Sequence, residues 1–286
     1  MGELTAIHCA ACGGTVRLAA GKSVPACMFC GANASDLAPA EEPEGIEESE
    51  GALPFAIDEA AAQRAFLAFA GSSRWYPNDL SKARVEMRAL WFPAWAWSGH
   101  VETHWTGLVS ASTASGKRPT AGDESVTVPQ VLVPASSALR RDELTQLGPF
   151  AEEHLAPLPD DHDVAVEVSE LTRSMARTQA HEAMRTRHAG GISSSHGLTK
   201  IKASSLVTEM VGRPVLLPVW IGAYRYRNTP YRILVHGQTG NLVGDAPISI
   251  YKVVLAVSLV LCILGAIGLA ILACMGGGGI VAVIAR

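Results

Sequence analysis

Charged side chains are scarce in this chain of 286 residues, and those near the N-terminus are mostly acidic. Asp, Glu, Lys and Arg make up 17% of the sequence, and residues 1–52 contain two basic and eight acidic residues. Binding to DNA or RNA requires Lys and Arg side chains that neutralise phosphates. The N-terminal region is therefore poorly suited to nucleic acid, and nucleic-acid binding is not the function we expect.

The sequence also lacks the motifs that identify several enzyme classes. It contains no His-Glu-x-x-His zinc-protease motif, no Gly-x-x-x-x-Gly-Lys-Ser/Thr phosphate loop and no Gly-x-Ser-x-Gly nucleophile turn. A strand period of two places His100, Glu102 and His104 on one face, where they could bind a metal. Val101 and Trp105 form the opposite, apolar face, so we expect the histidines to be the polar side of a sheet. We therefore expect a non-enzymatic protein.

A secretion signal is absent too, because the first thirty residues have no charged segment followed by an apolar run. The N-terminal domain is therefore expected to stay in the cytoplasm. At the other end, Val253–Met275 contains twenty-three residues without a charge. A helix of that length spans about 35 Å, enough to cross a hydrocarbon core of about 30 Å. We predict a single-pass protein of the inner (cytoplasmic) membrane, anchored by a transmembrane helix at 253–275 and ending in a Gly-rich apolar tail, 276–286.

Four cysteines near the N-terminus form two closely spaced pairs, Cys9 with Cys12 and Cys27 with Cys30, separated by fourteen residues. Two Cys-x-x-Cys pairs at this separation are typical of a tetrahedral zinc site with four thiolate ligands. Such a site has no open coordination position, so the zinc is expected to be structural and not catalytic. We predict a zinc ribbon over residues 1–37 that holds one Zn²⁺.

Other chemistries are open to the same cysteines. They could form two disulfides, although thiols in a reducing cytoplasm stay reduced. They could also act as a redox sensor that releases zinc on oxidation, although two matched pairs are more typical of a zinc site than of a redox Cys-x-x-Cys. Cys262 and Cys274 lie inside the predicted membrane helix, where we expect them to be small apolar residues and not metal ligands.

Composition divides the rest of the chain into a linker and a domain. Residues 38–52 contain six glutamates and two prolines, and we predict a disordered acidic linker because such a segment cannot bury apolar area. Residues 53–252 are long enough for a core of their own. Strand patterns in hairpins, with a few separate helices, predict an α+β domain on an antiparallel sheet. The predicted helices are 59–69, 136–147 and 164–188, and the predicted strands are 15–18 in the ribbon and 90–105, 126–133, 201–210, 215–226 and 231–236 in the domain, with a loop at 193–195.

Several segments resemble a known group of bacterial proteins. They are the cysteine pairs, Leu53–Phe55, Trp75–Leu80, Phe92–Trp95 and, most clearly, residues 217–249 (LPVWIGAYRYRNTPYRILVHGQTGNLVGDAPIS). On these segments the chain resembles bacterial membrane-anchored zinc-ribbon proteins of the TFIIB type, whereas residues 155–163 depart from the pattern. The resemblance implies a membrane adaptor that acts with phage-shock (PspA-like) or flotillin-like (SPFH) proteins.

These features together predict a tail-anchored membrane adaptor or scaffold. The zinc ribbon, on its flexible acidic tether, would recruit a protein partner at the membrane, in membrane stress or membrane organisation. The alternative is a membrane-tethered nucleic-acid-binding protein, which a steep dependence of binding on salt concentration would favour.

Overall fold

A computed structural model describes residues 4–11, 13–19, 26–29, 32–41, 44–111, 116–158, 164–227 and 229–276 of the chain. The chain forms two compact units. The first unit joins residues 1–66 to residues 84–245, and the second joins residues 67–83 to residues 246–286.

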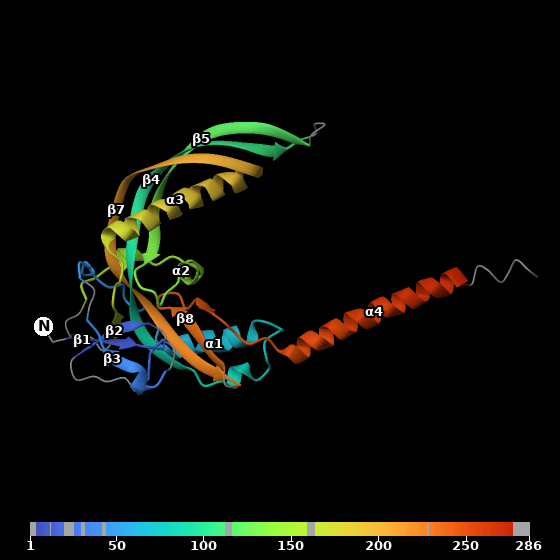
Figure 1. The fold of residues 1–286 in the computed structure, drawn as a ribbon, viewed down its shortest axis with the longest axis horizontal. Helices are drawn as coiled ribbons and strands as arrows, with labels where there is room; N and C mark the ends of the chain where they lie inside the picture. The colour runs from blue at the N-terminus through green and yellow to red at the C-terminus, as the bar shows by residue number, and fades with distance from the viewer. Residues whose placement is uncertain are drawn as a thin grey trace, which may run out of the picture. The chain divides into compact units, whose positions relative to one another are not determined.

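The first unit is built on one mixed sheet (Figure 1). Nine strands of the described residues join in the order β3-β1-β2-β6-β4-β7-β8-β9, with β5 paired to β4 beside this path. Neighbouring strands are antiparallel except for the short β6, which runs parallel to β4. The α+β class predicted from the sequence is confirmed. The strands are β1 (Leu4–Cys9), β2 (Thr15–Ala19), β3 (Leu37–Pro39), β4 (Glu86–Ser110), β5 (Lys117–Pro134), β6 (Ala165–Glu167), β7 (Leu198–Tyr226), β8 (Thr229–His236) and β9 (Leu242–Gly244).

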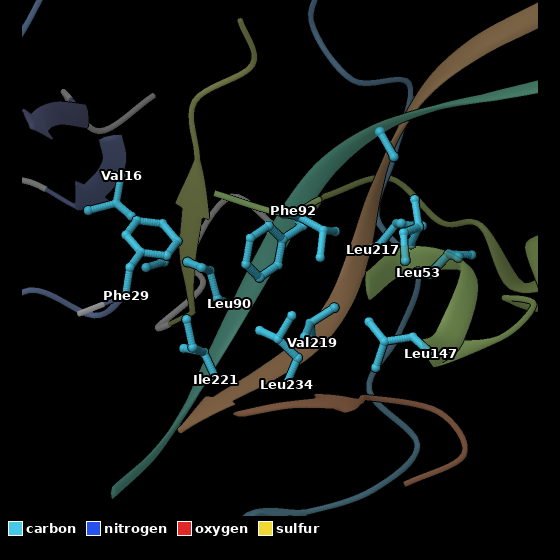
Figure 2. Packing of buried hydrophobic residues seen from close by; sticks show 14 of the residues in the cluster. Val16, Phe29, Leu53, Leu90, Phe92, Leu147, Leu217, Val219, Ile221 and Leu234 are labelled. Atoms are coloured by element: carbon cyan, nitrogen blue, oxygen red, sulfur yellow. The ribbon is translucent and has the colours of Figure 1, made fainter. Parts of the chain in front are cut away.

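The main core of this unit lies on one face of β4, β7 and β8, against α2 (Arg141–Leu147). The period of two along a strand sends alternate apolar side chains to that face. Figure 2 shows that Val16 and Phe29, from the N-terminal region, lie at one end of the same cluster. The buried members shown there include Leu53, Leu90, Phe92, Leu147, Leu217, Val219, Ile221 and Leu234.

Strands β4, β5 and β7 continue beyond this core as a three-stranded arm, in which Trp95–Ser110 of β4 is the central strand (Figure 1). At about 3.3 Å per residue the arm is roughly 50 Å long. Opposite Ser98 and Gly99 the register shifts by one residue in both outer strands. At the β7 shift, Glu209 has a φ of +52°. Because bulges bend strands and increase their twist, the arm curves at this point.

Helix α3 (Arg173–Ser195) lies along one face of the arm (Figure 1). Ala176, Ala180 and Met184 recur every four residues, so they share the helix face that packs on the sheet. They meet Trp95 and Trp97, whose rings stack with centroids 5.9 Å apart. The contacts become polar further along the arm. There, Thr103 Oγ1 lies 2.9 Å from His188 Nδ1, and His196 Nε2 lies 2.6 Å from Glu124 Oε1.

Some element predictions are confirmed and others are wrong. Helix α1 (Glu59–Gly71) begins as predicted at Asp58, whose Oδ1 accepts a hydrogen bond from the N–H of Ala61 at 2.7 Å. The predicted helix 164–188 is wrong at its beginning, because residues 165–167 form β6 and pair with β2 and β4. The predicted loop 193–195 belongs to α3. The predicted strands 201–210 and 215–226 are parts of the single strand β7.

The structure also differs from the predicted disordered linker at 38–52. Residues 37–39 form β3, which pairs with β1. Further along, Glu47 accepts hydrogen bonds from Arg173, with Nε to Oε1 at 2.8 Å and Nη2 to Oε2 at 2.6 Å. The N–H of Glu50 donates to the carbonyl of Pro214 at 2.9 Å. The bidentate pair and the backbone bonds hold the described part of the acidic segment along the first unit.

The second unit contains the end of α1, the loop that follows it and α4 (Ile250–Gly276). The loop ends in a single 3₁₀ turn, η2 (Leu80–Lys82). Residues 250–272 of α4 are long and apolar enough to cross a membrane. No residue in their most apolar 18-residue stretch is buried against protein. The predicted apolar C-terminal helix is therefore confirmed, whereas most of the predicted tail, 277–286, lies outside the described residues.

Candidate metal centre and membrane helix

The first cysteine pair begins at the end of β1. Cys9 is 1% exposed, and its N–H donates to the carbonyl of Gly14 at 2.9 Å. The N–H of Gly13 donates back to the Cys9 carbonyl at 2.8 Å. Gly13 has a φ of +80°, a conformation that favours glycine because it has no Cβ. These bonds close a tight turn immediately after β1.

The second cysteine pair begins with a residue that makes a similar backbone bond. Cys27 is 3% exposed, and its N–H donates to the carbonyl of Ala32 at 2.7 Å. The bond spans five residues, as does the bond from Cys9 to Gly14. A guanidinium nitrogen of Arg88 donates to the carbonyl of Ala26 at 3.2 Å, which ties this turn to β4. The two cysteine turns thus share a backbone bond of the same span.

Phe29 joins the two turns and packs them on the sheet. Its side chain is 3% exposed, and its ring lies over Gly14, where a Cβ would come within 2.3 Å of the ring carbon Cδ2. On its other side it meets Phe92 of β4 edge to face, with centroids 6.1 Å apart. Because Gly14 lacks a side chain, Cys9 and Cys27 can lie in one buried cluster.

Two of the four predicted zinc ligands, Cys9 and Cys27, lie among the described residues. Cys12 and Cys30 lie outside the described residues, and within the described part of the chain no group of three or more His, Cys, Asp or Glu side chains is placed to hold a metal. The described half nevertheless offers two buried thiols in matching turns, each followed three residues later by a second cysteine. Thiolates in this pattern are the usual ligands of structural zinc. The neighbouring His8 points elsewhere, since its Nδ1 lies 3.0 Å from Thr15 Oγ1.

The polar face of the arm holds the two histidines whose strand spacing would suit a second metal site. Val101 and Trp105 are buried, as predicted, and His100, Glu102 and His104 occupy the opposite face. His100 Nε2 lies 3.8 Å from Glu102 Oε1, and its Nδ1 lies 3.3 Å from the hydroxyl of Thr127. These contacts are those of a polar sheet surface.

A small cleft adjoins the second cysteine turn. Three arginines line it, Arg84, Arg88 and Arg225, together with Met28 of the turn. Arg88 pairs with Glu86 at 2.8 Å. Among the described residues, Arg84 and Arg225 have no ion-pair partner, so the cleft carries an excess of positive charge. The charge count of residues 1–52 did not reveal this excess, because the three arginines come from later in the chain.

Three buried ionisable side chains fix the loops around the core. Glu143 of α2 forms ion pairs with Arg232 of β8 and with Arg140. His236 is stacked on Phe150, and its Nε2–H donates to the Pro149 carbonyl at 3.1 Å. Its Nδ1 accepts backbone N–H bonds at 3.1 and 3.3 Å, so the ring is neutral, and burial lowers its pKa.

Glu167 of β6 is the third buried group, and it lies between the ribbon strand β2 and β4. The pKa of this carboxyl group is raised well above its usual value, mainly because the group is buried. Within the described residues its Oε2 has no hydrogen-bond partner. Burial therefore disfavours the charged form of this carboxyl group, at the junction of the N-terminal strands with the central sheet.

The apolar C-terminal helix, α4, has a contact that the sequence did not predict. Lys252, near the beginning of α4, donates through Nζ to the carbonyl of Tyr76 and to Asn78 Oδ1, each at 2.6 Å. The N–H of Ser249 donates to the carbonyl of Trp75 at 2.8 Å. The sequence indicated a loop at 74–78 and a lysine beside the span, but no local pattern connects residues so far apart.

Comparison of the chain with known protein families, with curated proteins and with solved structures finds no match.

Proposed function

We propose that the protein is a non-enzymatic adaptor, anchored in the inner membrane by α4, whose cytoplasmic part docks a protein partner along the outer edge of β7. One Zn²⁺, held by Cys9, Cys12, Cys27 and Cys30, would be structural and would stabilise the two cysteine turns. The partners implied by the sequence resemblance, PspA-like or SPFH-type proteins, are the first candidates to test.

The edge of β7 is the observation that carries the proposal. Among the described residues, Thr199–Thr208 of β7 pairs with β4 on one side and with no strand on the other. Leu206 is 59% exposed, and Val211, just beyond the bulge, is 68% exposed. An unpaired strand edge presents a row of N–H and C=O groups, and apolar side chains beside it give a partner strand something to pack on.

The other edge of the arm differs from the β7 edge in a way that supports this choice. The outer edge of β5 carries Pro119 and Pro129, and proline cannot donate a hydrogen bond to an added strand. β7 has no proline before Pro214. The arm thus has one edge protected against strand addition and one edge open to it.

The packing of the cysteine turns changes how the adaptor would work. The sequence predicts a ribbon that moves on a flexible tether, but β2 pairs with β6 and Phe29 belongs to the main core. The ribbon is therefore proposed as a fixed part of the docking body. The partner would gain its position at the membrane from α4, and the zinc ion would keep the N-terminal edge of the sheet folded.

Photo-crosslinking in native membranes tests the docking edge. A crosslinking amino acid would be placed at Leu206 in full-length protein and, as the control, at Met175 of α3, which is similarly exposed. We expect a specific protein adduct from position 206 that disappears when Val211→Lys is added. Equal adducts at both positions, or none at 206, would refute docking on β7. Metal analysis of the same protein should find one zinc per chain, lost in Cys12→Ser/Cys30→Ser.

The arginine cleft supports a second candidate function, a membrane-tethered nucleic-acid-binding protein. Arg84 and Arg225 could contact two phosphates beside the second cysteine turn. In that case, binding of single-stranded DNA would weaken with salt at a log–log slope of about −0.7 for each phosphate neutralised. Arg84→Gln/Arg225→Gln should reduce that slope by more than one. Absence of binding at low salt would eliminate this candidate.

A further inference from the structure

The loop after α1 is fastened to the start of the membrane helix. We refer to residues 72–82 as the juxtamembrane loop. Its Trp75 carbonyl accepts the N–H of Ser249, and its Tyr76 carbonyl and Asn78 side chain accept Lys252 Nζ. Three hydrogen bonds therefore hold the loop beside the last charged residue before the apolar run of α4.

The side chains of this loop are those found where proteins meet the membrane surface. Trp75 and Tyr76 are half-buried, and Tyr76 packs against Phe69 with ring centroids 5.5 Å apart. Tyr251, at the beginning of α4, is exposed. Trp and Tyr are enriched at membrane interfaces because an apolar ring with a polar edge suits both phases.

The charges beside these rings are mostly positive. The charged side chains among the described residues of this unit are Arg74, Lys82, Lys252 and Asp79, a net charge of +2. The guanidinium of Arg74 lies over the ring of Trp75, 5.2 Å from its centroid. Lys252 is bonded to neutral oxygens, so these hydrogen bonds orient its charge without cancelling it.

We propose that the juxtamembrane loop, with Lys252, is a binding site for the headgroups of anionic phospholipids. The proposal rests on α4 lying in the membrane and is independent of the adaptor role. Where α4 enters the lipid, the loop bonded to its first turn must lie at headgroup depth. Arg74 and Lys82, both exposed, would contact phosphates, and Trp75 would insert among the glycerol groups.

Anionic lipid is the occupant that these observations favour. The loop is continuous with a helix whose most apolar window is entirely exposed, so lipid already surrounds the neighbouring surface. A surface that carries anionic lipid attracts nearby Lys and Arg side chains, and each contributes about a five-fold preference. A zwitterionic headgroup supplies no such net attraction.

Fluorescence quenching of Trp75 tests the site directly. Full-length protein would be reconstituted into phosphatidylcholine vesicles containing equal amounts of either brominated phosphatidylglycerol or brominated phosphatidylcholine. Trp75 is the tryptophan of the second unit, and subtracting the signal of Trp75→Phe isolates it. We expect the anionic quencher to be several-fold more effective, and we expect high salt to reduce the difference.

Paired variants distinguish the loop from general charge. Arg74→Gln/Lys82→Gln should equalise the two quenchers, whereas Lys117→Gln/Lys200→Gln, which removes the same charge from the arm, should leave the preference intact. Equal quenching in the wild type would overturn the preference for anionic lipid. Absence of quenching by either lipid would show that the loop does not reach the bilayer and would overturn the site. The purified protein has no partner present, so failure of the adaptor proposal would leave these results unchanged.

Discussion

Replacing Phe29 by alanine tests whether the cysteine turns are packed into the first unit. Truncation of a buried phenylalanine lowers the free energy of unfolding by about 3–5 kcal/mol, through lost burial and the cavity left behind. The edge-to-face contact with Phe92, at 6.1 Å, accounts for about 0.5–1.5 kcal/mol of this. Because Phe29 lies at one end of the core cluster, where the turn can partly relax, we expect a loss of about 3 kcal/mol.

The assay is urea unfolding of the full-length protein in detergent, followed by tryptophan fluorescence. Trp91, Trp95 and Trp97 are buried in the first unit, so their emission reports its unfolding. With an m-value of about 2–3 kcal/mol/M, the midpoint should fall by roughly 1–1.5 M urea. Met175→Ala is the control, because Met175 lies in the same unit, is 52% exposed, and its truncation should cost less than about 0.5 kcal/mol.

A midpoint shift in Phe29→Ala no larger than that of the control would refute the packing argument. The flexible ribbon predicted from the sequence would then be the correct arrangement. Zinc analysis of the same samples separates two causes of a large shift. If zinc is retained, the lost stability comes from packing; if zinc is lost as well, packing and metal binding depend on each other.

Four further predictions concern buried groups. Gly212→Ala should destabilise the arm by about 1–3 kcal/mol, because the new Cβ would lie 2.4 Å from the indole of Trp97, and an unchanged calorimetric unfolding temperature would contradict this. Glu143→Ala should cost about 1.5–3 kcal/mol in urea unfolding, because the half-buried Arg232 loses the buried carboxylate to which it is bonded; a cost below about 1 kcal/mol would show that the pair is solvated. Burial raises the pKa of Glu167, so above about pH 4.5 the folded state keeps a proton that the unfolded state releases. The free energy of unfolding should therefore fall as pH rises, and Glu167→Gln should remove this fall. Identical pH profiles for the two proteins would show that Glu167 does not cause the fall. Burial lowers the pKa of His236, so below about pH 6.5 the unfolded state binds a proton first and the urea midpoint should fall; the same fall in His236→Gln would assign it to another group.

The elements that local patterns predicted correctly are those whose signals are complete within a short window. Asp58 and the apolar spacing after it were enough to place α1, and the uninterrupted apolar run was enough to place α4. The alternation around Val101 correctly separated the buried face of β4 from its polar face. In each case the controlling interaction joins neighbours in sequence or follows one period along the chain.

The wrong predictions have a common physical cause. Residues 165–167 look helical in isolation, but strand pairing with β2 and β4 determines their conformation. The composition of the acidic segment is typical of disorder, but its Glu47 accepts a hydrogen bond from Arg173, 126 residues away. The composition of a segment indicates how much apolar area it can bury, but it does not indicate whether a distant arginine will bond to the segment.

Local sequence therefore carries the signals of the two ends of this protein, the cysteine pairs and the apolar helix. Cysteine spacing predicts the ligands of a zinc ion, and the apolar run predicted the helix α4, because both signals come from residues close together in the chain. Long-range contacts decided the rest: the packing of Phe29 on Phe92, the open edge of β7 and the bond from Lys252 to Asn78, which spans 174 residues. Such contacts exist only once the whole chain has folded, because complementary groups far apart in sequence leave no periodic signal.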